Sequence, residues 1–103
     1  MTDTPDYNLP PMHPGEMLRE EFLVPLRISA GQLAKAAGVA RPRIDRILRG
    51  EAAVTAEMAL RLGKVLDTGA DFWLTLQARH DMLQAQAAFG PALAVLQPLV
   101  RKQ

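Results

Sequence analysis

Two short apolar segments on either side of a single glycine, between residues 32 and 50, constrain the fold more than any other feature of the chain. The first segment offers a small apolar face made of Leu33, Ala34 and Ala37. The second places its aliphatic side chains at the i, i+3, i+4 spacing of one helix face, namely Ile44, Ile47 and Leu48. Gly38 lies between the segments, and glycine tolerates the left-handed backbone that ends a helix. The pattern predicts two short helices joined by a tight turn, the second ending at Gly50.

The other face of the second helix is polar and rich in arginine. At about 100° per residue, the side chains opposite the aliphatic stripe or on its flank are Pro42, Arg43, Asp45, Arg46 and Arg49. A helix that is anchored by aliphatic residues and fronted by arginines suits the major groove of DNA. An arginine-rich face is also often only a solvated surface, so features elsewhere in the chain must decide between the two interpretations.

The net charge of +1 hides an uneven distribution of charge along the chain. Residues 1–26 carry five acidic groups against one arginine, for a charge of −4. Residues 27–64 carry eight basic groups against three acidic ones, for a charge of +5. Because phosphate contacts supply much of the affinity for DNA, this basic middle third favours binding to a polyanion.

Length and composition argue against several classes of protein. With 103 residues, a single domain is expected. No apolar run approaches the roughly 18 residues of a membrane span, so we expect no membrane association. The N-terminal segment is acidic and rich in proline, so we expect no signal peptide. The lack of cysteine excludes disulfides and thiolate metal sites and fits a cytoplasmic protein.

Few residues suggest catalysis or metal binding. His13, His80 and Asp81 lack ligand spacing such as H-E-x-x-H, and the two histidines are far apart in sequence. Ser29 and Thr55 precede predicted helices and are interpreted as helix caps rather than nucleophiles. We therefore expect no catalytic site, no metal and no cofactor, and a protein that is not an enzyme.

The chain is predicted to be all-α, with five helices and a short C-terminal helix. Residues 1–11 are interpreted as a mobile tail. The first helix begins at Pro14, and Pro25 ends or kinks it near Leu23. Its buried side is predicted to be Leu18, Phe22 and Leu26.

Two further helices flank the glycine turn. The first opens at Ser29, which matches a capping box with Gln32, and runs to about residue 37. The second begins near Arg41 or Pro42, although Ala40 is a poor cap.

The remaining helices cover the last half of the chain. Thr55 caps a helix that ends near residue 66, and its packing side is predicted to be Ala59, Leu60, Gly63 and Leu66. After a break at residues 67–69, a fifth helix covers about residues 70–88 until Gly90 and Pro91 stop it. A short last helix is expected over residues 91–99. The expected division is a domain over residues 12–89 and a helical tail over residues 90–103.

These residues carry a resemblance to a known family. The chain resembles the Xre/Cro-type helix-turn-helix family at Ser29, Gln32-Leu33-Ala34, Gly38-Val39, Ile44, Ile47-Leu48, Gly50, Thr55 and Ala59-Leu60. It is similar to the HigA (VapI-type) antitoxins at His13-Pro14-Gly15-Glu16, residues 18–23, Pro25-Leu26, Arg43-Ile44, Arg49-Gly50, Thr55-Ala56, residues 59–62 and Phe72-Trp73-Leu74. Two positions depart from the family pattern. Ala40 replaces a common polar residue, and His80 stands where relatives often have tyrosine.

The resemblance covers about residues 12–83 and implies a fold and a function. It implies a five-helix, lambda repressor-like helix-turn-helix domain that binds double-stranded operator DNA as a homodimer and represses its own operon. It also implies a partner, a HigB-type ribonuclease toxin that cleaves mRNA and that the antitoxin neutralises by binding.

The arginine face suggests roles for individual residues. Arg41, Pro42 and Arg46 are predicted to contact bases, because arginine donates bidentately to guanine and proline suits a thymine methyl. Phosphate or supporting contacts are predicted for Ser29, Gln32, Lys35, Arg43 and Arg49. Asp45 either orients a neighbouring arginine or accepts a hydrogen bond from a cytosine amine.

Two apolar groups near the C-terminal end have alternative explanations. For Phe72, Trp73 and Leu76, a place in the core is favoured over a partner site. A dimer or toxin interface is favoured over simple core for part of a second group, namely Met82, Leu83, Phe89, Leu93, Leu96 and Leu99.

Three functions remain open at this point. The favoured one is a DNA-binding antitoxin that represses its own operon. The second is a stand-alone transcriptional repressor of the same fold with no toxin partner. The third is a protein-binding module that keeps the fold without the DNA activity.

Overall fold

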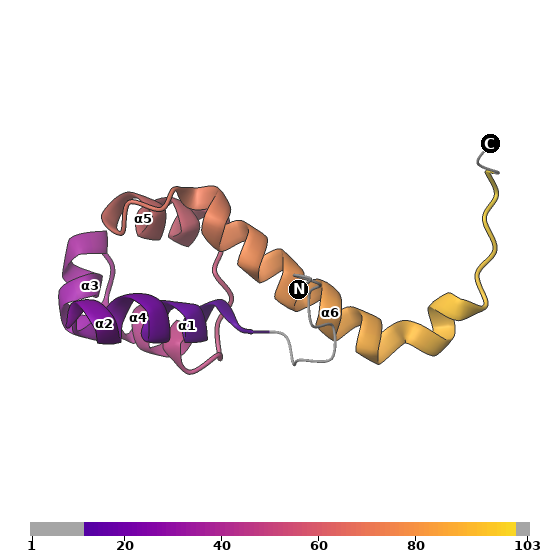
Figure 1. Ribbon diagram of the computed structural model, residues 1–103, viewed down its shortest axis with the longest axis horizontal. Helices are drawn as coiled ribbons and strands as arrows, with labels where there is room; N and C mark the ends of the chain where they lie inside the picture. Colours follow the sequence, from indigo (N-terminus) through magenta and orange to yellow (C-terminus); the bar gives the residue numbers. More distant parts are fainter. Residues whose placement is uncertain (1–11, 101–103) are drawn as a thin grey trace, which may run out of the picture.

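The computed structural model describes residues 12–100. This part of the chain contains five helices joined by turns and loops, and no strand. The predicted all-α fold is confirmed, whereas the tail expected over residues 1–11 lies outside the described part. The helices run in the order α1 (Pro14–Met17) continuous with η1 (Leu18–Leu23) and α2 (Val24–Leu26), α3 (Ala30–Ala37), α4 (Arg41–Leu48), α5 (Ala56–Val65) and α6 (Ala70–Ala94). The first four helices form a compact group, and α6 runs outward from it (Figure 1).

The first helix is wound more loosely in its middle. In η1 the backbone N–H of Val24 donates to the carbonyl oxygen of Arg19, five residues earlier, as in a π-helix. This winding brings Leu23 round to the buried side of Leu18, which α-helical spacing does not predict. Of the two predicted alternatives, an end or a kink near Leu23, the end is wrong, because the helix continues to Leu26.

Leu26 is a second correction in this helix. The side chain was expected on the buried face, but it is 59% exposed. It belongs to the last turn of the helix and lines an open groove beside Ile28 and Leu66, so no neighbouring element covers it.

The two helices around Gly38 form as predicted. The Ser29 hydroxyl accepts a 3.0 Å hydrogen bond from the backbone N–H of Gln32, whose side-chain oxygen accepts one of 2.8 Å from the backbone N–H of Ser29. Gly38 ends α3 with φ 73°. Beyond α4, Gly50 has φ 74°. Both glycines therefore adopt the left-handed backbone that closes a helix.

Helix α5 buries a different face from the predicted one. The Thr55 hydroxyl accepts a hydrogen bond from the backbone N–H of Met58, which confirms the cap. Leu60 is 65% exposed, so its predicted packing role is wrong. Apolar residues occur all round α5, and its buried side is Met58, Ala59, Leu62 and Gly63.

Helix α6 is longer than predicted. It continues through Gly90 and Pro91 to Ala94, so the expected stop and the expected separate last helix are both wrong. Proline removes one N–H from the helix ladder, and the carbonyl oxygen of Ala87 loses its partner. Pro91 and Ala87 lie on an exposed part of the helix, where water can satisfy that oxygen.

The core is centred on Trp73, which is fully buried at the start of α6. Its indole N–H donates a 2.8 Å hydrogen bond to the Thr68 hydroxyl, which satisfies the only polar group of the side chain. Phe22 and Phe72 pack against the indole at ring distances of 5.4 and 5.0 Å. The core interpretation is confirmed for Trp73, and Leu76 is partly buried against the same core. Phe72 remains 37% exposed.

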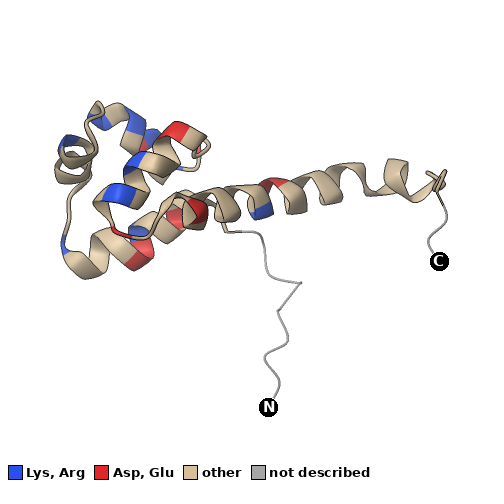
Figure 2. Ribbon diagram, turned by 90° about the horizontal axis from the view of Figure 1, so that it is seen from above, with Lys and Arg blue, Asp and Glu red and all other residues tan. Residues whose placement is uncertain are grey.

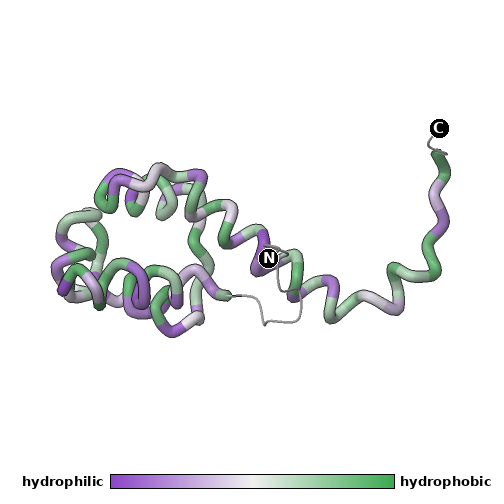
Figure 3. Tube along the Cα trace, viewed as in Figure 1, coloured by the Kyte–Doolittle hydropathy of each residue, from purple (hydrophilic) through white to green (hydrophobic). Residues whose placement is uncertain are grey.

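The outer half of α6 projects into solvent and is mostly apolar (Figure 3). The large exposed apolar side chains there are Met82, Phe89 and Leu93, and beyond the end of α6 they are followed by Val95, Leu96, Leu99 and Val100. Between Asp81 and Arg101 the sequence has no charged residue. Between residues 12 and 100, none of the helices combines the length and hydropathy that a bilayer crossing requires.

Candidate nucleic-acid interface

Helix α4 is anchored to the core by its aliphatic stripe and presents its opposite face to solvent. Ile44 and Ile47 are buried, and Leu48 is half-buried. The exposed side chains of the helix and its C-terminal residue are Arg41, Pro42, Arg43, Arg46 and Arg49. Basic residues lie on the compact end of the molecule, away from the uncharged outer half of α6 (Figure 2). The predicted arginine face is therefore accessible to a large polyanion.

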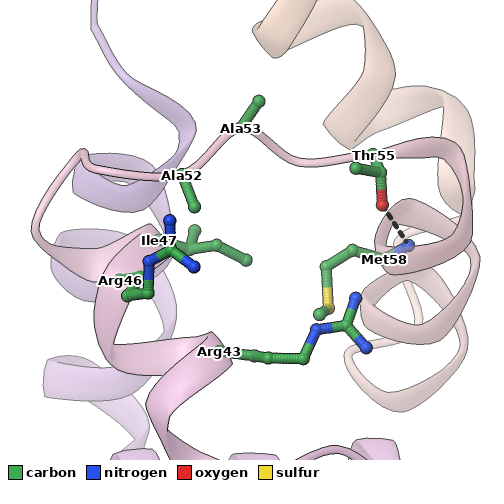
Figure 4. Close-up of a pocket in the computed structure, with 7 residues that line it drawn as sticks. All are labelled: Arg43, Arg46, Ile47, Ala52, Ala53, Thr55 and Met58. Atoms are coloured by element: carbon green, nitrogen blue, oxygen red, sulfur yellow. Dashed lines mark hydrogen bonds between the residues drawn. The ribbon is translucent and has the colours of Figure 1, made fainter.

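A pocket of about 180 Å³ opens between α4 and the loop that leads to α5 (Figure 4). Arg43 and Arg46 line it from α4, with Ile47 and Met58 supplying apolar surface. Residues of the loop complete the lining, namely Ala52, Ala53 and Thr55. The two alanines were not singled out from the sequence, because small neutral side chains carry no chemical signal there.

Three arginines of this face are paired with carboxylates. Arg41 Nε lies 3.5 Å from Asp45 Oδ2, one turn along α4, which is the kind of contact expected for an aspartate that orients an arginine. Arg43 Nη2 lies 3.6 Å from a carboxylate oxygen of Glu57 on α5.

The third pair joins Arg49 and Glu51 just beyond the end of α4, where Arg49 Nε lies 3.1 Å from Glu51 Oε2. The hydrogen bond from Arg49, reinforced by its charge, lowers the pKa of Glu51. Within residues 12–100, Arg46 forms none of the ion pairs that the structure contains. Among the arginines of α4, Arg46 is therefore the one that can bind DNA without first breaking an ion pair.

The start of α3 lies beside the start of α4. A Cβ atom built on Gly31 would lie 3.8 Å from Nη1 of Arg41, which places this guanidinium next to the first turn of α3. Ser29 and Gln32 are in the same turn, and their side chains are engaged with each other's backbone in the capping box. The structure thus groups Ser29 and Gln32 with Arg41, whereas Lys35 lies further along α3 as an exposed side chain.

His13 and His80, which are far apart in sequence, meet in the structure. Their rings pack edge to face with centroids 5.0 Å apart. The His13 Nδ1 accepts a 2.9 Å hydrogen bond from the backbone N–H of Gly15, so His13 caps α1. Burial, followed by the charge of His80, lowers the pKa of His13. No group of three or more potential ligands, counted over the described part of the chain, is placed to hold a metal ion.

Helix α4 buries an aliphatic stripe, exposes arginines on its other face and is joined by a glycine turn to the helix before it. This arrangement defines a helix-turn-helix DNA-binding protein. The helix-turn-helix family profile matches residues 18–73, which is more than half of the chain. The chain belongs to this family, and its relatives place it among the HigA and VapI-type antitoxins. The family consists of DNA-binding regulators and antitoxins rather than enzymes.

Three relatives illustrate the similarity. Virulence-associated protein I of Dichelobacter nodosus is 44% identical over 78 residues, which cover 76% of this chain and 72% of that protein. The antitoxin HigA of Pseudomonas aeruginosa, solved with the higBA promoter, has a TM-score of 0.82 and 42% identity over 87% of this chain and 99% of its own. Antitoxin GraA in complex with its operator has a TM-score of 0.84 and 43% identity over 95% of this chain and 100% of its own.

Proposed function

We propose that this protein is the antitoxin of a HigBA-like type II toxin–antitoxin module. It binds operator DNA as a homodimer, represses its own operon and neutralises a HigB-type toxin that cleaves mRNA. The observation that carries the proposal is the exposed arginine face of α4 in a chain whose relatives HigA and GraA were solved with promoter or operator DNA. Since operator DNA in bacteria lies in the cytoplasm, the proposal also locates the protein there.

In this proposal α4 enters the major groove. Arg46 contacts a base, because it is exposed, lines the pocket beside α4 and can donate bidentately to guanine. Arg41 and Pro42 contact bases from the start of the helix, and Asp45 holds Arg41 through their 3.5 Å ion pair. Contacts to phosphates or support for them come from Ser29, Gln32, Lys35, Arg43 and Arg49.

The outer half of α6 supports the homodimer. Its exposed side chains include Phe89 and Leu93, which lie one turn apart on a stretch without charge. An uncovered apolar stripe of this kind marks an interaction surface rather than a feature of a monomer. In such a dimer the two copies of α4 read the half-sites of a palindromic operator, which in dimeric helix-turn-helix proteins lie about 34 Å apart.

Co-expression with the neighbouring reading frame, followed by a gel shift on the DNA directly upstream, tests the proposal. A stable complex with the neighbouring product and a specific shift are the expected results. A specific shift with no complex would instead indicate a stand-alone repressor. A complex without a shift would indicate a protein-binding module.

Salt dependence sharpens the DNA part of this test. If several phosphates are neutralised, affinity should fall by orders of magnitude between roughly 50 and 200 mM salt. An affinity that does not respond to salt would contradict contact between the arginine face and the DNA backbone.

A further inference from the structure

The carboxylate of Glu57 lies between two arginines that come from different helices. Arg61, one turn further along α5, places Nη2 at 2.9 Å and Nε at 3.0 Å from Oε2 of Glu57. Arg43 of α4 approaches the other oxygen, Oε1, at 3.6 Å. The hydrogen bond from Arg61 lowers the pKa of Glu57, and the charges of both arginines add to that effect.

Arg61 also reaches the turn between α3 and α4. Its Nη1 donates a 2.8 Å hydrogen bond to the carbonyl oxygen of Ala37, the last residue of α3. The same nitrogen lies 3.5 Å from the carbonyl oxygen of Gly38. One guanidinium therefore joins the end of α3 to Glu57, and Glu57 joins α5 to α4.

The ion pairs of Glu57 contribute little to the stability of the core. The side chain of Glu57 is 57% exposed, and exposed ion pairs contribute little to the free energy of unfolding. A carboxylate beside the arginine face also repels DNA phosphates, which is a cost for a DNA-binding surface. The pairing of this carboxylate with two arginines can compensate for that cost. An arginine whose side chain is held in one direction favours a single orientation of the protein on DNA.

Resting on the proposed DNA binding, we propose that Glu57 is a positioning residue for operator recognition. Its carboxylate holds the Arg43 guanidinium at the wall of the pocket beside α4 and, through Arg61, holds the turn that sets α3 against α4. Phosphate and base contacts made by a fixed arginine set the register of the protein on the duplex. An arginine released from Glu57 supports binding to any sequence.

The variants Glu57→Gln and Glu16→Gln form a matched pair for the test. Each removes one exposed carboxylate from the first turn of a helix and raises the net charge by one, but within the described residues Glu16 forms none of the ion pairs with arginine. Dissociation constants are measured on the duplex directly upstream of the gene and on a scrambled duplex of the same length and composition. The ratio of the two constants reports specificity, and the thermal midpoint of unfolding reports stability.

Both variants should bind the scrambled duplex more tightly by a similar factor, because both remove one negative charge. For Glu57→Gln the specificity ratio should fall by about threefold or more, while for Glu16→Gln it stays within about twofold of wild type. A smaller fall for Glu57→Gln would overturn the positioning role and leave Glu57 as a helix N-terminal charge. The two variants should show similar thermal midpoints, and loss of specificity that merely follows loss of stability would also overturn it.

The double variant Arg43→Gln with Glu57→Gln shows whether Glu57 acts through Arg43. In the Arg43→Gln background, replacing Glu57 should lower the specificity ratio by less than it does in wild type, because only the route through Arg61 remains. An equal fall in both backgrounds would overturn the coupling between the two residues. If wild type binds the two duplexes equally, the proposed function itself is refuted. If wild type discriminates between them and Glu57→Gln leaves the specificity ratio unchanged, only the positioning role of Glu57 is refuted.

Discussion

The side-chain oxygen of Gln77 accepts a 2.7 Å hydrogen bond from the backbone N–H of Val54, across 23 residues of sequence. Gln77 is 8% exposed and Val54 is 3% exposed, so water does not compete for this bond. The amide nitrogen of Gln77 donates to Asp81 at 2.9 Å, which fixes the orientation of the side chain. This one contact ties α6 to the loop between α4 and α5, whose residues line the pocket beside the arginine face.

Replacing Gln77 by leucine should destabilise the protein by about 1–3 kcal/mol, because the buried N–H of Val54 loses its acceptor. The measurement is the free energy of unfolding in urea. Gln84→Leu, at an exposed position of the same helix, is the control and should change stability little. Equal stability of the two variants would mean that the Val54 N–H finds another partner.

Gly15→Ala should be strongly destabilising, by about 1–3 kcal/mol or more. A Cβ atom there would collide with the backbone carbonyl of Ile47, so α1 would have to move away from α4. Gly31→Ala is the matched control, since a Cβ atom at that position of α3 would meet only the side chains of Arg41 and Ser29, at 3.8 and 3.9 Å. It should stabilise the protein by about 0.5–1 kcal/mol through its helix propensity. Thermal or urea unfolding of both variants distinguishes these effects.

Local signals predicted the fold where a residue type has one dominant conformational use. Ser29 with Gln32 predicted a capping box, and Gly38 and Gly50 predicted left-handed helix ends. Each depends only on a few neighbouring residues. The aliphatic spacing of α4 likewise predicted its buried face, because an apolar stripe at helical spacing turns toward the core.

Predictions failed where the answer depends on winding or on a distant neighbour. Leu23 is buried because η1 is a π-helix, and i, i+4 spacing cannot reveal that change of period. Pro91 was expected to stop a helix, but its part of α6 faces solvent, where the lost hydrogen bond costs less. The meeting of His13 and His80 depends on how α1 packs on α6, which no local pattern encodes.

For the candidate site, the sequence likewise predicted local features but not contacts between distant residues. Exposure of the arginines on α4 follows from the periodicity of one helix. The partners of those arginines do not, because Glu57 belongs to another helix and Ala52 to a loop.

Stability should decrease as the pH falls below about 6.5, through His13. Burial and the nearby charge of His80 lower the pKa of His13 below its ordinary value of 6.5. The unfolded chain therefore takes up a proton at higher pH than the folded one does. The stabilising contribution is fully present above that value and is lost as the pH falls through the folded pKa.

Urea unfolding of wild type and His13→Asn between about pH 8 and pH 5 measures this contribution. Asparagine can still cap α1, because its side-chain oxygen accepts from the backbone as Nδ1 of His13 does, and it does not titrate. The variant should lose less stability than wild type over this interval. Parallel pH profiles would show that carboxylates, rather than His13, dominate the acid response.

Arg46→Ala should weaken binding to the upstream duplex by roughly 1–3 kcal/mol and relax sequence preference at one position of each half-site. The physical reason is that an exposed arginine of α4 without a carboxylate partner, within the described residues, is free to donate to a guanine. Arg79→Ala removes an exposed positive charge from α6 and is the control for non-specific electrostatics. Unchanged operator binding by Arg46→Ala would exclude this residue from base contact.

Phe89→Glu and Leu93→Glu should each convert the dimer to monomer at concentrations where wild type is dimeric, as measured by sedimentation velocity. Their side chains are 60% and 51% exposed, so burying them against a second copy of α6 contributes to association, and a buried carboxylate there opposes it. Gln84→Glu adds the same charge to the opposite face of the same helix and should leave the dimer intact. If both apolar variants remain dimeric, the interface must lie elsewhere, with α5 and its exposed Leu60 as the next surface to test. If the interface is correct, the monomeric variants should lose affinity for a duplex with two half-sites. They should keep the affinity of wild type for a duplex with a single half-site. That pair of results would mean that α6 contributes to DNA binding only by pairing two copies of α4.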